Sequence, residues 1–534
     1  MSARVLIVFA LLAVVIGVPF ALRPPDPDKP VGPADRLIIV SPHNEAVRQE
    51  FAAAFRRHHR AATGRDIVID WRVPGGTSEI ARILASDYTA AFQNHWVNTL
   101  RRPWTAEVDA SFDDPSVTLG PDPAADTPAQ AARRAFLESR VGIGIDLFFG
   151  GGAYDFIQQA KAGRLADSGL LAARPEWFGD DIMPAQLSGE PFRDPRGLWL
   201  GAAVSSFGIC YNRDSLTRLG VTSSPDSWDA LADPKLYRQV ALADPTKSGS
   251  AAKAFEQIIQ QKMQQRLTAQ PADPDAAVRQ GWLDGLGLIQ RISANSRFFT
   301  DSSPKVPLDV SQGDAAAGMC IDFYGRFQGE SVRRPDGTSR LNYLTPPGGS
   351  SIGVDPIAML RGAPHPELAR SFMEYVLSPE GQRLLNFRVG TPGGPERFAL
   401  RRLPVRRDFY VAANEPFRSD PGINPYDEAR LFTYHEEWTG PLFRVLGFAI
   451  RILSIDTHTE QSAAWRALRA ADFPPQATAR FGDLSAFDYD TCLQKIRPAL
   501  RAADRLQEVR LAQQLGDRFR RQYAEAASLA TQAR

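Results

Sequence analysis

Residues 37–57 read LIIVSPHNEAVRQEFAAAFRR, and this stretch decides the fold class of the 534-residue chain. The apolar run 37–40 is typical of a strand that is buried on both faces of a parallel sheet. After the polar turn that follows, apolar side chains recur at helical spacing, which predicts a helix packed back on the strand. Open α/β sheets bind ligands where a strand ends in such a turn before a helix N-terminus. The first candidate ligand-binding residues are therefore Ser41, His43, Asn44 and Glu45.

The same pattern of strand, polar turn and helix follows twice more in the first 160 residues. The strand 66–73 (DIVIDWRV) precedes the turn 74–79 (PGGTSE), and the strand 141–149 (VGIGIDLFF) runs into three glycines. These repeats predict the opening of a parallel sheet. Glycine allows a ligand to approach the backbone closely, although a tight turn explains the glycines equally well. The candidate ligand-binding residues here are Thr77, Gly151 and Gly152.

The middle of the chain predicts a second sheet. The apolar run 198–211 is too long for one ordinary strand, and Ser205 and Ser206 interrupt it, so we expect it to pass from one lobe to another. The strand 240–243 ends in DPTKSGS before a helix, and this hydroxyl cluster could donate hydrogen bonds to an anion at the helix N-terminus. Ordinary N-capping is the alternative. The candidates are Thr246, Ser248, Gly249 and Ser250.

A further strand is predicted at 315–324 (AAAGMCIDFY), with Asp322 and Tyr324 on one of its faces. Cys320 in this strand and Cys210 in the run 198–211 could form a disulfide in an oxidising compartment. They could also be two buried small hydrophobic residues, which is the interpretation we favour.

The N-terminus predicts export from the cytoplasm. Residues 1–23 contain an uncharged apolar run that suits a cleaved signal peptide or an uncleaved membrane anchor, and a Pro-rich linker follows at 24–35. We therefore expect a periplasmic or extracytoplasmic protein, anchored to the inner membrane if the first helix is retained.

Composition and motifs exclude several classes of function. The formal net charge is +1 and the sequence contains no basic block, so a nucleic-acid partner is not expected. The HExxH motif, a P-loop and CxxC pairs are all absent from the sequence. We therefore predict no enzyme and no resident cofactor.

The predicted organisation is two α/β lobes with a helical C-terminal extension. The first lobe takes residues 36–204, with an insertion at about 87–140, and is completed by residues 351–410. The second lobe takes residues 205–350. Residues 411–534 have amphipathic helical character and form the extension, which we expect to pack against the lobes.

Six motifs occur in an order that resembles the extracellular solute-binding proteins of ABC importers, within the group of the ferric-ion-binding proteins. They are IIVSPHNEA, IDLFFGGG, FGICYNRDSL, VALADPTKSGSAAKAF, QGDAAAGMCIDFY and ELARSFMEYVLSPEGQRLL. The resemblance covers roughly residues 36–410. It implies a two-lobed periplasmic-binding-protein fold of type II, in which crossover strands join two open sheets that close over a small ligand.

The resemblance also implies particular ligand-binding residues. Iron-binding members hold the metal with a His, a Glu and two adjacent Tyr, of which His43 and Tyr324 are matched here. Phe323 replaces the first tyrosine, and Gly150 begins the turn where the glutamate is expected. Neither phenyl nor glycine ligates iron, so the remaining hydroxyls and backbone N–H groups suit an anion better than direct Fe(III) binding.

The resulting hypothesis is a solute-binding component that captures a small anionic solute or metal and delivers it to an ABC permease. The ligand would be a phosphate ester, a carboxylate, or Fe(III) or its chelate. We expect a monomer. A membrane-anchored sensor or scaffold with the same fold is the alternative, and an enzyme that uses His43 and Glu45 is a more distant one.

Overall fold

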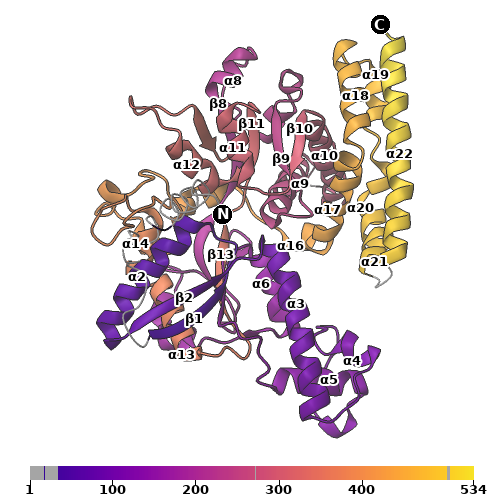
Figure 1. The fold of residues 1–534 in the computed structure, drawn as a ribbon. Helices are drawn as coiled ribbons and strands as arrows, with labels where there is room; N and C mark the ends of the chain where they lie inside the picture. Colours follow the sequence, from indigo (N-terminus) through magenta and orange to yellow (C-terminus); the bar gives the residue numbers. More distant parts are fainter. Residues whose placement is uncertain (1–16, 18–33, 271, 502–504) are drawn as a thin grey trace, which may run out of the picture.

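The computed structural model describes Gly17 and residues 34–270, 272–501 and 505–534. The predicted signal peptide or anchor and nearly all of the Pro-rich linker lie outside these residues. Two sheets with helices around them form two lobes, and further helices stand beside the second lobe (Figure 1). The two-lobed α/β organisation with a helical C-terminal extension is therefore confirmed.

Lobe 1 is built around a sheet whose main strand order is β14-β7-β13-β3-β1-β2. The strand β1 (Ala34–Val40) runs parallel to the edge strand β2 (Asp66–Arg72) and to β3 (Leu147–Phe149). The strand β13 (Gly353–Leu360) runs antiparallel to both β3 and β7 (Leu200–Ser205). The short strand β14 (Leu403–Pro404) pairs with β7 at the sheet edge. Parallel strands next to one another place several strand ends and helix N-termini at one edge of the sheet.

Helices cover this sheet because each carries one apolar stripe. They are α2 (Glu45–Thr63), α3 (Thr77–Asn94), α6 (Ala153–Ala162), α13 (Pro366–Leu377) and α14 (Pro379–Asn386). Phe51 and Phe55 of α2 are fully buried in the same apolar cluster as Phe372 of α13. The rings of Phe55 and Phe372 meet edge to face, with their centroids 5.0 Å apart.

Lobe 2 contains the sheet β10-β9-β11-β8-β12. Its strands are β8 (Phe207–Asn212), β9 (Val240–Ala243), β10 (Ser296–Thr300), β11 (Ala317–Ile321) and β12 (Leu341–Leu344). The principal helices are α9 (Gly249–Ala269), α10 (Pro274–Ala294), α11 (Lys305–Gln312) and α12 (Asp322–Ser331).

One local prediction in lobe 2 was wrong. The strand predicted at 315–324 ends at Ile321, and α12 begins at Asp322. Asp322 and Tyr324 therefore lie on the first turn of a helix and not on one face of a strand. The apolar and aromatic residues at 319–324 suit either state, and pairing of β11 with β8 ends at Ile321.

Residues between α3 and β3 form a small helical projection at the lower end of lobe 1 (Figure 1). It contains α4 (Ala106–Ser111) and α5 (Pro128–Glu138). A separate aromatic cluster holds it together, in which the rings of Phe92 and Phe112 stack at 5.0 Å. The projection thus has a core of its own and leaves the sheet of lobe 1 undisturbed.

The C-terminal helices share one apolar core with lobe 2. They include α17 (Phe443–Ile450), α18 (His458–Ala470), α19 (Pro475–Phe481) and α22 (Arg505–Gln532). Trp282 of α10 is fully buried among them, and its Nε1 donates to Phe487 O at 2.8 Å. By length and composition, the helical stretch Glu436–Ile455 could span a membrane, but more than half of it is buried inside the protein. It is part of this shared core.

The three cysteines are free and buried. Cys210 on β8 and Cys320 on β11 lie on adjacent strands but are not directly opposite each other. The Cys210 thiol donates to Gly318 O at 3.5 Å. In the structure both behave as buried small side chains, the interpretation that the sequence favoured.

Candidate functional site

The edge of lobe 1 where its parallel strands end faces the N-terminus of α9 in lobe 2. A β-carbon placed on Gly76, in the turn after β2, would lie 3.7 Å from Lys247 O in the turn before α9. A β-carbon on Gly249 would lie 3.6 Å from Oδ2 of Asp155, on the first turn of α6. The two lobes therefore approach each other closely here, and we call the boundary between them the interlobe cleft.

The turn after β1 positions His43 in this cleft. Asn44 caps α2 by accepting from Val47 N at 3.1 Å, and Ser41 Oγ accepts from His43 N at 3.1 Å. The His43 ring packs edge to face on Phe149, with the centroids 4.6 Å apart. Gly150 has a φ of 93°, and a β-carbon on it would lie 2.4 Å from His43 Nε2. Glycine is therefore required at 150 by both the backbone angle and the space that the imidazole takes.

Arg402, directly before β14, reaches into the same cleft. Its Nη1 lies 2.7 Å from His43 Nε2, and its Nη2 forms an ion pair with Asp355 on β13. Its guanidinium also lies over the Phe323 ring of lobe 2, 4.0 Å from the centroid. Only 1% of Arg402 is exposed. One buried cation thus contacts both lobes at the end of β1.

These contacts determine the protonation of His43. A guanidinium donates hydrogen bonds and does not accept them, so His43 Nε2 accepts and the ring proton lies on Nδ1. Burial, together with the charges of Arg402 and Arg48, holds the pKa of His43 well below its ordinary value. Burial also lowers the pKa of Arg402 to about 10, which keeps it charged at neutral pH. His43 is therefore neutral, with Nδ1 available to donate to a bound molecule.

Lobe 2 contributes a second buried charged pair through α12. Asp322 is fully buried, and its Oδ2 lies 3.5 Å from Nη1 of Arg326, one turn further along the helix. Burial raises the pKa of Asp322 to about 6. Tyr324 is half-buried on the same turn, and burial raises its pKa also.

Several polar atoms in this region have no hydrogen-bond partner among the described residues. They are His43 Nδ1, Ser205 Oγ, both carboxylate oxygens of Asp322, Arg326 Nη1 and Arg402 Nε. Buried polar atoms in folded proteins are nearly always hydrogen-bonded, and an unpaired one is costly. A group of such atoms contributed by both lobes is the arrangement expected where a polar ligand completes the hydrogen bonding.

The predicted hydroxyl cluster lies at the N-terminus of α9. Ser248 caps the helix by accepting from Ala251 N at 3.3 Å, and it also shares a short hydrogen bond with Ser303. Thr246 Oγ1 donates to Asp244 at 2.7 Å, so this hydroxyl is already engaged. Gly249 and Ser250 form the first turn of α9. Capping by Ser248 is therefore present, while ligand contact by this hydroxyl cluster stays a prediction.

The other predicted residues lie in three places. Thr77 begins α3 against Gly151, whose β-carbon would lie 2.5 Å from Thr77 Cγ2, and Gly152 precedes α6. Ser205 and Ser206 lie at the crossover from β7 to β8, where Ser206 Oγ lies 3.0 Å from Thr345 Oγ1. Glu45 is exposed and accepts from Gln49 at 2.6 Å, so its carboxylate is used on the surface of α2.

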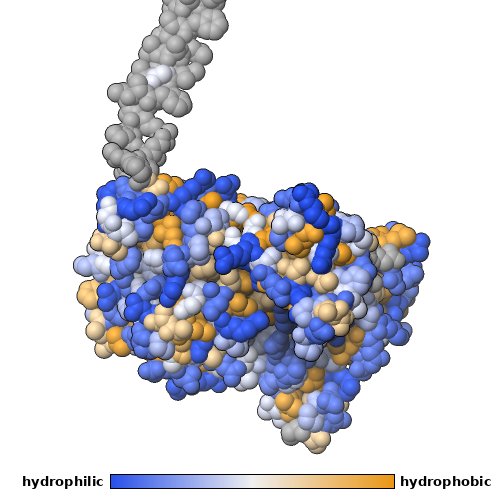
Figure 2. All heavy atoms as spheres, turned by 90° about the horizontal axis from the view of Figure 1, so that it is seen from below, coloured by the Kyte–Doolittle hydropathy of each residue, from blue (hydrophilic) through white to orange (hydrophobic). Residues whose placement is uncertain are grey.

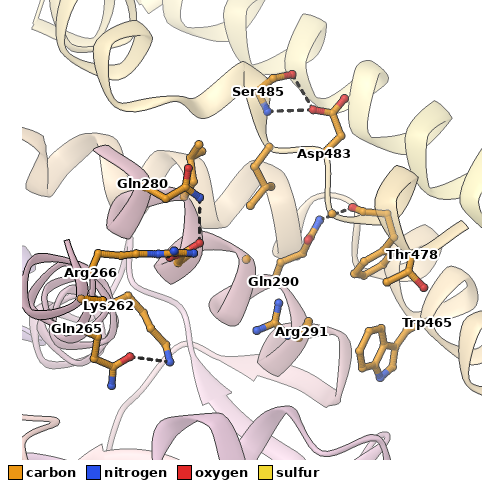
Figure 3. Close-up of a pocket in the computed structure, with 17 residues that line it drawn as sticks. Lys262, Gln265, Arg266, Gln280, Gln290, Arg291, Trp465, Thr478, Asp483 and Ser485 are labelled. Atoms are coloured by element: carbon orange, nitrogen blue, oxygen red, sulfur yellow. Dashed lines mark hydrogen bonds and ion pairs between the residues drawn. The ribbon is translucent and has the colours of Figure 1, made fainter. Parts of the chain in front are cut away.

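A groove of about 820 Å³ lies elsewhere, between the α9–α10 pair and the C-terminal helices (Figure 3). Two of its basic side chains, Lys262 and Arg266, are paired with Asp229 and Asp284. The groove does not include any of the residues predicted from the sequence. It is separate from the interlobe cleft.

Comparison with protein families assigns the central part of this chain. Residues 144–406 match the family model of the bacterial extracellular solute-binding proteins. This part of the chain is a solute-binding domain of that family. The matched range begins just before β3 and ends after β14, so it includes all of lobe 2 and the return to lobe 1. The family consists of binding proteins, not enzymes, that work outside the cytoplasm.

Three curated relatives each match part of this chain. An uncharacterised protein of Haemophilus influenzae is 25% identical over 45% of this chain and 60% of its own length. The phosphoglycerate transport regulatory protein PgtC of Salmonella typhimurium is 26% identical over 36% of this chain and 42% of its own. A putrescine/cadaverine-binding protein of Pseudomonas aeruginosa is 24% identical over 36% of this chain and 50% of its own length. The chain thus spans about half the length of these relatives.

Solved structures of periplasmic binding proteins resemble the chain as well. AfuA of Actinobacillus pleuropneumoniae, with fructose-6-phosphate bound, is 16% identical over 81% of this chain and 97% of its own, with a TM-score of 0.46. Iron-bound HitA of Pseudomonas aeruginosa is 15% identical over 77% of this chain and 98% of its own, with a TM-score of 0.45. At these values neither likeness decides which ligand the solute-binding domain takes.

Sequence reasoning missed three charged residues of the cleft. Arg402 follows Arg401 and precedes Arg406 and Arg407, and the sequence offers no signal that singles it out. Asp355 stands in an apolar run that becomes β13, and a lone carboxylate in a buried strand was a usable signal. Arg326 follows Asp322 by one helical turn, which is recognisable only once α12 is known to begin at Asp322.

Proposed function

We propose that this protein is the extracytoplasmic binding component of an ABC importer and captures a small anionic solute in the interlobe cleft. The family supports solute binding. The single observation that carries the proposal is the group of buried polar atoms around His43, Asp322, Arg326 and Arg402 that lack a hydrogen-bond partner among the described residues and come from both lobes. A ligand there would contact both lobes at once, which favours the closed arrangement.

The sign of the charge favours an anion. The Arg402 guanidinium contacts His43 Nε2, the group that would hold a ferric ion by the resemblance. A metal cation at that nitrogen would have to displace a buried positive charge. The described residues contain no cluster of three or more His, Cys, Asp or Glu side chains that could hold a metal ion. A phosphate ester or a carboxylate instead finds guanidinium N–H groups that have no hydrogen-bond partner among the described residues, Arg402 Nε and Arg326 Nη1.

The neighbouring carboxylate suggests what else the solute carries. Both oxygens of Asp322 can accept hydrogen bonds, and Ser205 offers a hydroxyl on the adjoining crossover. A solute with hydroxyl groups next to its anionic group would satisfy the donors and the acceptors together. Delivery to a membrane permease and an N-terminal anchor or cleaved signal belong to the same proposal.

The test is native mass spectrometry with elemental analysis of the full chain, purified without chelator. A co-purified phosphorylated or carboxylated metabolite without metal supports the proposal. One iron per chain would contradict an anionic solute and support ferric binding instead. If no small molecule co-purifies and none of a panel of phosphate esters, carboxylates and ferric citrate raises the melting temperature, solute capture itself is contradicted.

A further inference from the structure

The described chain passes between the lobes three times. Two of these passes connect strands of the two sheets, and the third does not. The first two passes are β7 to β8 and β12 to β13. After β14 the chain remains on lobe 1, where Tyr426 and Ala429 are part of its core. It then enters the core of lobe 2 at Leu442. We call residues 430–439, which connect the two, the third crossing.

The third crossing lies between a turn of lobe 1 and one flank of α9. Ser188 O accepts from Tyr434 N at 2.8 Å on the lobe 1 side. On the lobe 2 side, the Gln260 side chain donates to His435 O at 2.8 Å and accepts from His435 N at 2.9 Å. Gln264 adds a bond to Thr433 O at 2.8 Å. The crossing is thus hydrogen-bonded to both lobes.

A buried ionic cluster joins the three pieces at this point. Nζ of Lys253 on α9 lies 2.9 Å from Glu190 of lobe 1 and 2.9 Å from Glu256, one turn further along α9. Lys253 Nζ also lies 3.5 Å from the centre of the Tyr434 ring. The Tyr434 hydroxyl donates to Glu256 at 3.0 Å. Lobe 1, lobe 2 and the third crossing therefore share one ammonium group.

The second crossover is tied to the same cluster. Ser351, between β12 and β13, donates from Oγ to Glu190 at 2.5 Å, and its N donates to Gln257 Oε1 of α9 at 2.9 Å. The side chains of Glu190 and Glu256 are 5% and 0% exposed. Burial by itself would lower the pKa of Lys253, but the two carboxylates raise it well above its ordinary value. Lys253 is therefore charged, and its bond to Glu190 is little screened by solvent.

We propose that Lys253 is a positioning residue that restrains how far the lobes open, through its bridge from α9 to Glu190 and the third crossing. Opening the cleft moves lobe 1 relative to α9, and the Lys253–Glu190 contact is a buried charged bond that spans this boundary. Arg401 of lobe 1 and Glu330 of lobe 2 form another ion pair between the lobes, at 2.8 Å, but Glu330 is exposed. Removing the ammonium group leaves two buried carboxylates facing each other across the boundary, which pushes the lobes apart. The inference rests on the proposed function only in that solute capture requires the lobes to move.

The experiment measures the interlobe distance of the full chain without any ligand, by pulsed electron paramagnetic resonance. Spin labels are attached at Ala61→Cys on α2 and Thr217→Cys on α8 (Arg213–Arg218), both exposed, while the native cysteines are buried. Lys253→Met is compared with Lys262→Met. The control lies on the same helix, and its ion pair with Asp229, at 2.8 Å, stays within lobe 2.

We expect Lys253→Met to shift the distance distribution to longer values and to broaden it, with Lys262→Met unchanged. The proposal is overturned if Lys253→Met has the same distance distribution as the unsubstituted protein. It is also overturned if Lys253→Met and Lys262→Met shift the distribution equally. If circular dichroism shows that Lys253→Met does not fold, the distance is measured in Tyr434→Phe instead. The proposal then requires a small shift to longer distances in that variant. Because no ligand is used, this result is independent of whether native mass spectrometry finds an anionic solute.

Discussion

The Arg402 guanidinium and the His43 imidazole are 359 residues apart in the sequence and 2.7 Å apart in the structure. This contact brings the last edge strand of lobe 1 to the end of its first strand. It also places a buried positive charge at the centre of the cleft, with Asp355 as its partner and the Phe323 ring of lobe 2 beneath it. The chemistry of the cleft is therefore set by a residue from the end of the solute-binding domain.

Replacing Arg402 by Gln should remove the anion-binding donor and leave Asp355 without its cation. We expect at least about tenfold weaker binding of the co-purified solute, since each buried charged hydrogen bond contributes roughly 2–5 kcal/mol. The free energy of unfolding should fall by roughly 3–5 kcal/mol, as for other broken buried ion pairs. Calorimetric titration and urea unfolding measure the two effects.

The control for this variant is Arg388→Gln at an exposed position of the same lobe. In Arg402→Gln with Asp355→Asn, the stability should partly recover while the binding does not. The pKa of His43 should also rise from its lowered value, because Arg402 is one of the causes that lower it. An unchanged His43 titration by NMR would contradict the contact.

Gly150→Ala should displace the His43 ring. The added carbon would lie 2.4 Å from Nε2, and a φ of 93° disfavours any side chain there. We expect a loss of stability of about 1–3 kcal/mol and a loss of solute binding. Gly152→Ala is the matched control two residues on, where a β-carbon meets nothing within 4 Å. Equal melting temperatures of the two variants would contradict the argument.

Asp322 should make stability depend on pH in an unusual direction. Its pKa is about 6 in the fold and about 3.9 when unfolded, so between these values the folded state binds the extra proton. This group therefore stabilises the fold below about pH 4, and that contribution is lost as the pH rises through about 6. The difference is on the order of 3 kcal/mol. Asp322→Asn should remove this dependence in urea unfolding at pH 4–7, and a slope equal to that of the unsubstituted protein would count against it.

Ser248 and Ser250 should separate capping from ligand contact at α9. Ser248→Ala removes the cap and should lower the free energy of unfolding by about 1 kcal/mol. Ser250 has no capping bond in the structure, so Ser250→Ala should leave unfolding nearly unchanged. If the anion reaches this helix end, Ser250→Ala weakens binding in calorimetric titration. If binding is unchanged in both variants, the anion is held by Arg402 and Arg326 alone.

Deleting residues 436–534 should prevent stable folding of lobe 2. Trp282 and Leu286 of α10 share their core with the C-terminal helices, and this surface would become exposed. We expect an insoluble or molten product, checked by circular dichroism and gel filtration. A soluble, cooperatively unfolding product would show that the extension is a separate domain.

The apolar face of the extension is in fact used against lobe 2, as the amphipathic pattern predicted. On the face of the protein in Figure 2, apolar side chains are scattered in small areas among polar ones. The prediction of a monomer stays a prediction.

The sequence by itself determined what local patterns encode. Apolar runs that end in polar turns marked β1, β2, β3 and β9, because strand burial and helix starts depend on residues close together in the chain. The glycines at 150 and 151 and the histidine at 43 were found for the same reason. The ordered motifs then identified the family. The strand predicted to include Asp322 and Tyr324 failed because a short aromatic run fits a strand or a helix equally well.

Only the tertiary structure decided which charges meet. Arg402 reaches His43 because β14 pairs with β7 at the edge of a sheet begun by β1, and Lys253 meets Glu190 because the third crossing joins the two lobes. A charged side chain has the same local pattern whether it is solvated or buried. Its role depends on the dielectric surroundings and partners that distant segments bring to it, and these are properties of the folded chain.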